Sequence, residues 1–529
     1  MMIVGKISHY TWYIAAILIV ASLLLTRLRA AAWLRDPRFQ KAVLIAAWVA
    51  VAAGVLAAIG YFLLPRFYDH IEPHVVITAL NAQAGLHIHP DWTKGEGAWG
   101  TPYGPLLYEW AGLPLMISKT VMAAKLASIT AFLFAMVVLW QMPKTVGGPG
   151  GPFIAAFYLL AVTAYGPFAF WVRSEPLLLA LTAGAVLVVQ LKTRWVVWLA
   201  LGVLAGLAAA TKLPAVFYFA PIVVYAALQA PSLAELAVSC LIGLAGFVLG
   251  LVAPFAGDPG EARRLAMYVT EMTHHGLSKL LLAVNLAVLV VLAFPYSLRV
   301  WKARGGLTDW RGAAMPVILT ASMLAVAIIG AKPGSGPHHL MPFIPILLYL
   351  TLAFPAGADE AAPDAAEPAF VLAMLVNAVA PLLLTLAFVI GAARDVGETR
   401  AGYREAADLA ARYPGAQFGP TDDAHYEQLY LRVAAAFHGA RLSFDNASWT
   451  DLDAAGLKPA ADPVDFAFDR PRTWILPKTG QPFSVTSRYT RKTVFSPEFQ
   501  AQFLQACQRV EVRQVFAVWR CAPQSAPAA

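Results

Sequence analysis

Two carboxylates stand close together in the first long polar stretch of this chain. Within residues 68–74 (YDHIEPH), Asp69 and Glu72 are three residues apart and directly follow an apolar run. If the segment is helical before Pro73, both side chains lie on one face of the helix. Such a pair can supply a general base or ligate a metal ion. A solvated helix end, or a carboxylate paired with Arg66, is the structural alternative.

Four histidines lie near these acids and suggest a metal centre: His70, His74, His87 and His89. Their spacings fit no closed structural zinc site, which argues against a centre built from histidines. A divalent metal ion, if the protein uses one, is therefore expected on Asp69 and Glu72. The sequence does not decide whether the protein uses a divalent metal ion.

The rest of this loop, residues 65–117, alternates apolar and turn residues and is rich in aromatic side chains. We expect short helices along the membrane interface, where aromatic rings are enriched. Membrane anchoring is the expected role of most of them. The aromatic residues are Trp92, Trp99, Tyr103, Tyr108 and Trp110.

Isolated cations recur in later turns. Arg173 and Glu175 share one turn. Charged side chains at a membrane carry a large desolvation cost unless they have a function or form a close ion pair. Lys212 occupies a second turn. The alternatives are a mutual salt bridge for the first pair and a snorkelling side chain for the lysine.

Two further loops add anion-binding candidates. In residues 331–339 (AKPGSGPHH), Lys332 precedes Gly and Ser residues that can present hydrogen-bond donors to an anion, and His338 and His339 follow. The loop at 256–278 contains His274 and His275, and its residues 261–273 can form an amphipathic helix. Carboxylates and scattered cations in these loops suit an anionic, membrane-held substrate that an external acceptor attacks.

The elements that position these residues are membrane helices. The chain has 529 residues, of which 59% are apolar and 13% charged. These figures exclude a soluble enzyme, a disordered chain and a fibrous repeat. The net charge of +8 comes mostly from residues between apolar runs, so it indicates membrane topology and predicts no nucleic-acid partner.

About twelve apolar runs are long enough to cross a bilayer, and each must be helical because lipid offers no partner for free backbone groups. We therefore predict a polytopic α-helical protein with about 12 transmembrane helices. The runs are roughly 10–26, 42–64, 118–141, 152–171, 175–191, 195–211, 213–229, 234–255, 279–298, 313–331, 340–356 and 369–392.

Lysine and arginine set the expected orientation. The connection after the first run carries Arg27, Arg29, Arg35, Arg38 and Lys41, which is typical of a cytoplasmic loop. Alternation along the chain then places all the loops discussed above on the opposite, external side. Residues 1–392 form the predicted membrane domain, and residues 393–529 form a soluble external α/β domain.

The C-terminal segment contains two of the three cysteines. If residues 393–529 lie in an oxidising periplasm, Cys507 and Cys521 are expected to form a disulfide, with two free thiols as the alternative. Four polar residues in this segment are candidates for acceptor contacts, although solvated surface residues are the simpler interpretation. They are Asp422, Asp423, Tyr426 and Arg432.

In this order of features the membrane domain resembles the GT-C superfamily of integral-membrane glycosyltransferases, which includes protein O-mannosyltransferases and the aminoarabinose transferase of lipid A. The resemblance rests on five elements in order along the chain. They are the acids Asp69 and Glu72, Gly85 with Tyr103–Leu106, Arg173–Glu175, Gly206–Lys212, and Lys332–Pro342.

The resemblance implies an inverting transfer of a sugar from a polyprenyl-phosphate donor to a glycan, lipid or protein acceptor. Asp69 or Glu72 would be the base, and some family members use a divalent metal. Arg173, Lys212, Lys332, His338 and His339 would bind the donor phosphate, and Tyr103, Glu175, His274 and His275 would line the donor and acceptor loops. Family members commonly have acids that are adjacent or one residue apart, so the identity of the base stays open. The implied location is the bacterial inner membrane.

Two other classes of function fit a polytopic chain. A transporter or lipid flippase should show internal repeats and polar residues near mid-span, and the sequence shows no clear repeat. A non-enzymatic assembly or sensor protein would leave the carboxylate loop unexplained. The sequence therefore favours the transferase, with the transporter as the alternative.

Overall fold

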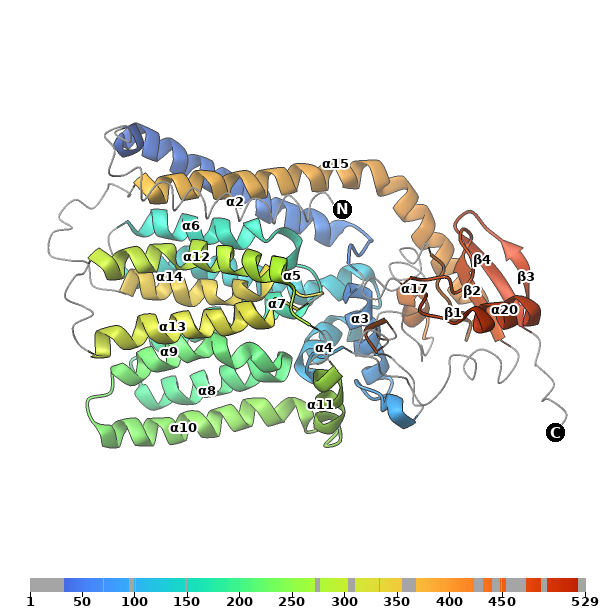
Figure 1. Ribbon diagram of the computed structural model, residues 1–529, viewed down its shortest axis with the longest axis horizontal. Coiled ribbons are helices and arrows are strands. Elements are labelled where there is room, and N and C mark those ends of the chain that lie inside the picture. Colours follow the sequence, from blue (N-terminus) through green and yellow to red (C-terminus); the bar gives the residue numbers. More distant parts are fainter. Residues whose placement is uncertain are drawn as a thin grey trace. The chain divides into compact units, whose positions relative to one another are not determined.

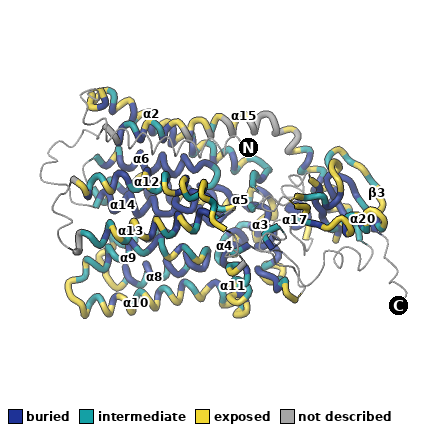
Figure 2. Tube along the Cα trace, viewed as in Figure 1, coloured by how far each residue is buried: buried dark blue, intermediate teal, exposed yellow. Residues whose placement is uncertain are grey.

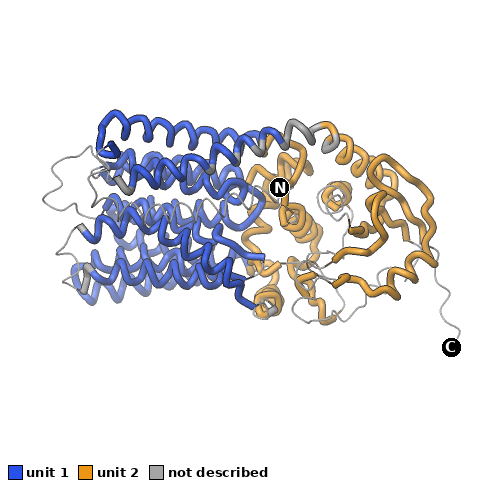
Figure 3. Tube along the Cα trace, turned by 45° about the horizontal axis from the view of Figure 1, so that its top comes forward, with its two compact units in different colours: residues 1–60, 128–254, 276–391 blue, residues 61–127, 255–275, 392–529 orange. Residues whose placement is uncertain are grey.

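The structure is a computed structural model that forms two compact units (Figure 3). Unit 1 comprises residues 1–60, 128–254 and 276–391, and unit 2 comprises residues 61–127, 255–275 and 392–529. We describe each unit by itself. The structure describes residues 33–69, 71–94, 99, 101–147, 150–271, 276–302, 310–332, 334–353, 368–422, 432–439, 448, 450–452, 472–486 and 492–521.

Unit 1 is a bundle of apolar helices that run side by side (Figure 1). Every predicted apolar run that falls within the described residues corresponds to a helix, and the run at 10–26 lies outside them. The helices that lie wholly or mostly in unit 1 are α2 (Pro37–Leu63), α5 (Val121–Val146), α6 (Gly151–Ala164), α7 (Ser174–Val189), α8 (Arg194–Thr211), α9 (Val216–Leu228), α10 (Leu233–Val252), α12 (Lys279–Lys302), α13 (Trp310–Ile329), α14 (Ile344–Ala353) and α15 (Pro368–Arg412).

Five of the described helical segments are long and apolar enough to span a membrane, which identifies a multi-pass membrane protein. Shorter apolar helices accompany them, including α6, α7 and α14. The five segments are Pro37–Leu63, Val121–Val146, Arg194–Thr211, Leu233–Phe255 and Lys279–Trp301.

Helix α10 presents most of its surface outward (Figure 2). Leu241 and Val248 are among its exposed apolar side chains, which is the distribution expected of a helix that faces lipid. Cys240 is also exposed on this helix, whereas its place inside an apolar run predicts a core residue. That prediction is wrong, because α10 packs against α8 through its glycines.

A seam of glycines joins α8 to α10. A Cβ atom on Gly206 would lie 2.2 Å from the Phe247 carbonyl oxygen, and one on Gly246 would lie 2.4 Å from the Leu199 oxygen. Gly202 and Gly250 are equally constrained. Small residues allow membrane helices to approach to backbone contact, which replaces the hydrophobic effect as the source of association in lipid. The seam therefore fixes how α8 lies against α10, and α8 ends at Thr211, directly before Lys212.

Unit 2 combines the first loop with the C-terminal segment. The loop folds into α3 (Ile71–Gln83), η2 (Trp92–Lys94), α4 (Pro105–Gly112) and η3 (Leu113–Met116), and α11 (Glu261–Glu271) belongs to the same unit. The rings of Trp99, Tyr103 and Tyr108 are buried inside the protein. Membrane anchoring is therefore the wrong role for these three, because protein side chains surround the rings.

The C-terminal segment contains a four-stranded sheet of order β1-β2-β4-β3. Strand β1 pairs in parallel with β2, whereas β4 pairs antiparallel with both β2 and β3. A disulfide joins Cys507 to Cys521 at the β3–β4 pair, and Trp474, Phe483 and Phe503 pack in the core beside it. The bounds are β1 (Gln417–Phe418), α17 (Arg432–Phe437), β2 (Arg472–Pro477), α20 (Pro497–Ala506), β3 (Cys507–Val512) and β4 (Phe516–Cys521).

Helix α15 does not end at the expected domain boundary. It runs for 45 residues from Pro368 to Arg412, well past residue 392. The sequence beyond 392 is polar but rich in Ala and Arg, which are strong helix formers. The change from apolar to polar residues marks a change of environment, and it does not interrupt the helix.

The glycine seam generates a stability prediction. We expect Gly206→Ala and Gly246→Ala to lower the free energy of unfolding by about 1–3 kcal/mol, because each new methyl group collides with a backbone carbonyl. Thermal unfolding of the purified protein in detergent measures the effect. Gly184→Ala in α7 is the matched control, since its Cβ would meet Leu204 at an ordinary 3.6 Å. Equal unfolding temperatures for all three variants would contradict the seam.

Candidate anion-binding site

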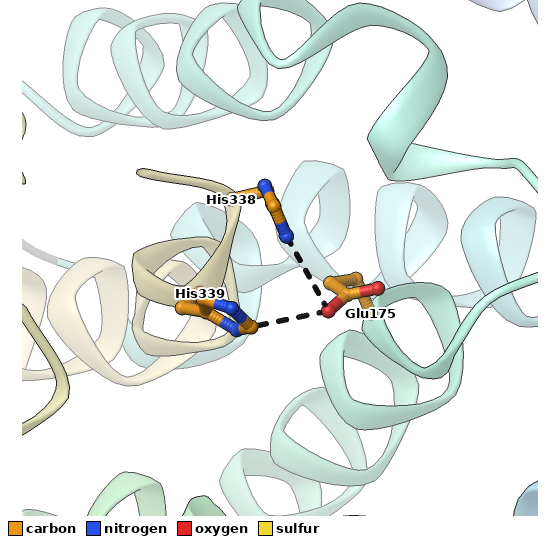
Figure 4. A group of neighbouring side chains, drawn as sticks. All are labelled: Glu175, His338 and His339. Atoms are coloured by element: carbon orange, nitrogen blue, oxygen red, sulfur yellow. Dashed lines mark ion pairs between the residues drawn. The ribbon is translucent and has the colours of Figure 1, made fainter. Parts of the chain in front are cut away.

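Glu175 lies at the centre of a buried charged cluster in unit 1 (Figure 4). It occupies the first turn of α7, where the partial positive charge of the helix N-terminus favours a carboxylate. Its side chain is 1% exposed, so water cannot compensate its charge. An ionised carboxylate so deeply buried must be paired with cations.

Lys212 supplies the closest cation. Its Nζ lies 3.1 Å from Glu175 Oε1 and donates to His339 Nδ1 at 2.9 Å. A lysine ammonium can donate to Nδ1 only if that nitrogen carries no hydrogen, which assigns the His339 tautomer. The side chain of Lys212 turns into the protein, so the snorkelling alternative was wrong.

Arg173 and the two histidines complete the cluster. Arg173 Nε lies 3.5 Å from Glu175 Oε2, while His338 Nε2 and His339 Nδ1 lie 3.9 and 3.7 Å from Oε1. The Phe168 ring stacks on His338 at a centroid distance of 4.5 Å, and the Arg173 guanidinium lies 5.1 Å from the same ring. The pair that the sequence suggested between Arg173 and Glu175 therefore exists, but as part of a larger network.

Local sequence explains how three segments meet at this point. Lys212 follows the last residue of α8 in extended conformation, and the 3₁₀ turn η5 (Leu213–Ala215) leads from it into α9. The 3₁₀ segment η8 (Pro337–Phe343) carries both histidines, and Tyr218 holds it by donating to the His339 carbonyl at 2.8 Å. A Cβ on Gly330 would lie 3.1 Å from the His339 ring, so a small residue is needed there.

The charges of the cluster favour binding of an anion. Arg173 and Lys212 carry two positive charges against the single negative charge of Glu175, even with both histidines neutral. The site also contains the buried Ser174 hydroxyl, which has no hydrogen-bond partner among the described residues. A phosphate group suits such an array of donors, since its oxygens accept charge-assisted hydrogen bonds.

Glu175, His338 and His339 also have the spacing of metal ligands, with their ligand atoms within 4.8 Å of one another. The Lys212 ammonium contacts two of the three ligands directly. A divalent ion there would meet a positive charge about 3 Å from its own ligands. These residues therefore do not fit a resident metal ion.

Glu72 is the buried acid of the first loop. Tyr61 donates its hydroxyl hydrogen to Glu72 Oε1, and the amides of Tyr68 and Asp69 donate to Oε2 at 2.7 and 3.0 Å. Burial raises the pKa of this carboxyl, and the charge of nearby Lys125 opposes that rise. Its oxygens are thus committed to holding the chain just before α3.

Asp69 lies outside helix α3, which begins at Ile71 and continues through Pro73. The two acids therefore do not share a helix face, because proline in the first turn permits the helix to begin later than expected. Asp69 is half-buried, whereas Glu72 is fully buried. The backbone of Asp69 is tied to Glu72, which fixes the position of the less enclosed carboxylate.

Lys125 is a buried cation that the sequence analysis missed. Its Nζ donates to the carbonyls of Tyr61 and Leu64 at 2.7 Å each and lies 3.9 Å from the Tyr61 ring centroid. It thereby adds a cationic donor to two carbonyls at the end of α2, which also accept from the Leu64 and Arg66 amides. A lysine in an apolar run gives no signal of this role by itself.

Two histidines of the first loop link it to residues 258–261 within unit 2. His87 Nδ1 lies 2.8 Å from Asp258, and His89 pairs with Glu261 and contacts the Thr101 carbonyl at 2.8 Å. Arg264 forms ion pairs with both acids. The group His87, Asp258 and Glu261 has metal-ligand spacing, but Arg264 already supplies the positive charge.

The remaining candidates lie elsewhere. Lys332 is half-buried in the turn before η8, where its carbonyl accepts from Ser335 N at 3.0 Å. Tyr103 is buried in unit 2 beside α4, and Arg432 is buried in α17. Asp422 is exposed, and its amide donates to Ser484. Four expectations lie outside the described residues: His70, His274, His275 and the pair Asp423 and Tyr426.

Two solved structures are similar to this chain. They are crystal structures of ArnT from Cupriavidus metallidurans, in the apo state and bound to undecaprenyl phosphate. Each comparison covers 91% of this chain and 99% of the ArnT chain at 14% identity, with TM-scores of 0.49 and 0.50 respectively. The likeness to the second of these structures shows that this chain has a mostly helical, ArnT-like fold, whereas the number of spans and the external location of the C-terminal segment stay predictions. No protein-family profile and no curated protein sequence matches the chain.

The Glu175 cluster generates a stability prediction. We expect Glu175→Gln to lower the free energy of unfolding by about 3 kcal/mol, because it leaves Lys212 and Arg173 buried without their counter-charge. Glu235→Gln is the matched control, since Glu235 forms a partly exposed pair with Arg194 whose loss changes stability by less than about 1 kcal/mol. Chemical unfolding in detergent compares the two, and equal losses would refute a buried network at Glu175.

The His89–Glu261 pair predicts a pH dependence. Burial acts to raise the pKa of Glu261, but hydrogen bonds from His89 and Arg264 outweigh burial and hold the pKa below its ordinary value. The resulting stability is present above the unfolded pKa of about 4.3 and disappears as the pH falls through the folded pKa. Glu261→Gln should flatten the acid limb of the unfolding temperature against pH, while Glu498→Gln at an exposed position should not. An unchanged acid limb in the first variant would contradict the assignment.

Proposed function

We propose that this protein is a glycosyltransferase that moves a sugar from a polyprenyl-phosphate donor to an acceptor, with inversion at the anomeric carbon. The observation that carries the proposal is the buried Glu175 cluster, a cation-rich site at one end of a membrane helix bundle. The fold supports it, since the similar ArnT structure holds undecaprenyl phosphate. A membrane-embedded anion site suits a phosphate that arrives on a lipid tail.

In this proposal Arg173, Lys212 and the two histidines bind the donor phosphate. Arg173 and Lys212 supply charge, and Glu175 holds them in place before the donor binds. Such preorganised donors stabilise the charge that develops on the leaving phosphate without rearrangement during the reaction. Lys332 is an additional candidate because it precedes the histidines in the same segment.

Asp69 is the base in this proposal, and Glu72 is a positioning residue. Glu72 is enclosed and accepts hydrogen bonds from Tyr61 and two backbone amides, so it has little capacity to accept a substrate proton. Asp69 is less buried, and its backbone amide is anchored by Glu72. A base must reach the proton it removes, which favours the more accessible carboxylate.

The proposed step balances in atoms and charge. Asp69 takes the proton from an acceptor hydroxyl or amine, and the acceptor atom forms a bond to the anomeric carbon. The bond between that carbon and the phosphate oxygen breaks, and its electron pair leaves with the polyprenyl phosphate. No resident metal is needed, because the cations of the cluster neutralise the leaving phosphate.

The proposal includes the membrane in which the protein lies and the side on which it acts. We place the protein in the bacterial inner membrane with about twelve spans, and the reacting groups with the C-terminal α/β region on the periplasmic side. The distribution of Lys and Arg supports this orientation. The disulfide between Cys507 and Cys521 supports it independently, since such bonds persist in oxidising compartments. Asp422 and Arg432 are acceptor-side candidates.

The base assignment predicts unequal effects of two isosteric substitutions. With a polyprenyl-phosphate-linked sugar and envelope membranes as the acceptor source, Asp69→Asn should lower the release of polyprenyl phosphate at least about 100-fold. Glu72→Gln should lower the unfolding temperature and reduce activity less, and Glu109→Gln, at an exposed position of α4, should change neither. Full activity of Asp69→Asn would overturn the assignment.

The phosphate site predicts a separate loss. Lys212→Ala should lower turnover about 100- to 1,000-fold and weaken binding of undecaprenyl phosphate, because it removes a donor to the leaving group. Lys119→Ala, at an exposed position, is the matched control. If Lys212→Ala and Lys119→Ala bind and turn over equally, the cluster is not the phosphate site. Movement of a solute into vesicles, with no transfer from any donor, would favour a transporter.

A further inference from the structure

A polar cavity of about 270 Å³ lies in unit 1 at the opposite end of α7 and α8 from Glu175. Helix α7 begins beside Glu175 and ends at Val189, and α8 begins at Arg194 and ends beside Lys212. A helix of this length spans about 25 Å, so the two sites are separate. The Lys and Arg distribution assigns the cavity end of these helices to the cytoplasm.

The walls of this cavity carry a net positive charge. Lys192 and Arg194 line it, and Glu235 from α10 pairs with Arg194. Lys192 is exposed and has no carboxylate partner among the described residues. One cation is therefore available to an anionic ligand, and Arg194 can share its remaining donors because its guanidinium has five N–H groups.

Hydroxyl and amide groups add neutral donors to the cavity. Tyr349 donates to the Tyr225 oxygen at 3.3 Å, and their rings meet edge to face at 5.4 Å. The hydroxyl hydrogen of Tyr225 is then available to a ligand. Gln229 also lines the cavity, while Trp198 gives it an apolar wall. This combination suits a phosphodiester attached to an apolar body.

The surface around the cavity is apolar and exposed. Leu191 in its wall is 49% exposed, nearby Trp195 is 58% exposed, and Leu233 and Leu241 of α10 are 85% and 67% exposed. Acyl chains can lie against this surface while a headgroup occupies the cavity. Basic pockets between membrane helices on the cytoplasmic side are a recognised setting for anionic lipid headgroups.

We infer that this cavity binds the phosphodiester headgroup of an anionic membrane phospholipid, with Lys192 and Arg194 as charged ligands and Tyr225 as a hydroxyl donor. The site is independent of the proposed transferase reaction, since it shares no residue with the Glu175 cluster. A soluble phosphate would use the same charges but not the apolar surface. The test must therefore separate these two sources of one ligand chemistry.

Lipid retention measured by native mass spectrometry tests the inference. The full-length protein is stripped in detergent and titrated with phosphatidylglycerol, with phosphatidylethanolamine, and with glycerol phosphate as the soluble probe. We expect phosphatidylglycerol to bind best, and Lys192→Ala to weaken its binding about fivefold. Tyr225→Phe should weaken it without changing charge. Lys144→Ala is the matched control, because Lys144 is expected on the same side but contacts Trp140 outside the cavity.

The outcomes separate clearly. Selective loss of phosphatidylglycerol in the Lys192→Ala and Tyr225→Phe proteins, with none in Lys144→Ala, supports the site. Equal retention by all three variants overturns it, as does equal binding of the two lipids. Displacement of phosphatidylglycerol by glycerol phosphate at equal concentration overturns the lipid assignment in favour of a soluble anion. Unfolding temperatures of the variants, expected to be unchanged at these exposed or half-exposed positions, exclude misfolding as the cause.

Discussion

A single buried carboxylate governs the arrangement of the helix bundle. Glu175 is enclosed among apolar helices, where an unpaired charge would be prohibitively unfavourable. Its cationic neighbours come from three segments of the chain. Arg173 precedes α7, Lys212 follows α8, and η8 carries His338 and His339. These three chain segments must meet for any of the charges to be tolerated, so the electrostatics of one residue constrain the packing of the whole site.

The first loop obeys the same constraint with a different result. Glu72 is as deeply buried as Glu175, but its partners are a tyrosine hydroxyl and backbone amides, with Lys125 nearby. These groups occupy both oxygens of the Glu72 carboxylate with hydrogen bonds, so the residue has a structural role. Around Glu175 the cations outnumber the acid. Burial alone therefore does not identify a functional acid, and the balance of charge around it is what distinguishes the two.

Backbone packing connects the bundle to the chemistry. The glycines of α8 and α10 allow contact between the two backbones, and this contact fixes the end of α8 at which Lys212 enters the cluster. The same helix pair carries Arg194 and Glu235 at its other end, beside the polar cavity. The Gly206–Lys212 motif thus combines two roles about one and a half helical turns apart. Gly206 packs against α10, and Lys212 supplies a positive charge to the Glu175 cluster.

The sequence by itself determined the class of protein, the apolar runs that become helices, and the identities of Arg173, Lys212, His338 and His339 as scarce charges near a membrane end. Hydropathy is a local property, so these features can be predicted from short stretches of sequence. Only the tertiary structure decided that Glu175 is their centre, that Glu72 is enclosed while Asp69 is less so, and that His89 pairs with Glu261. Glu175 and His339 are separated by more than 160 residues, as are His89 and Glu261. Contacts over such separations depend on how the helices pack, which no local pattern encodes.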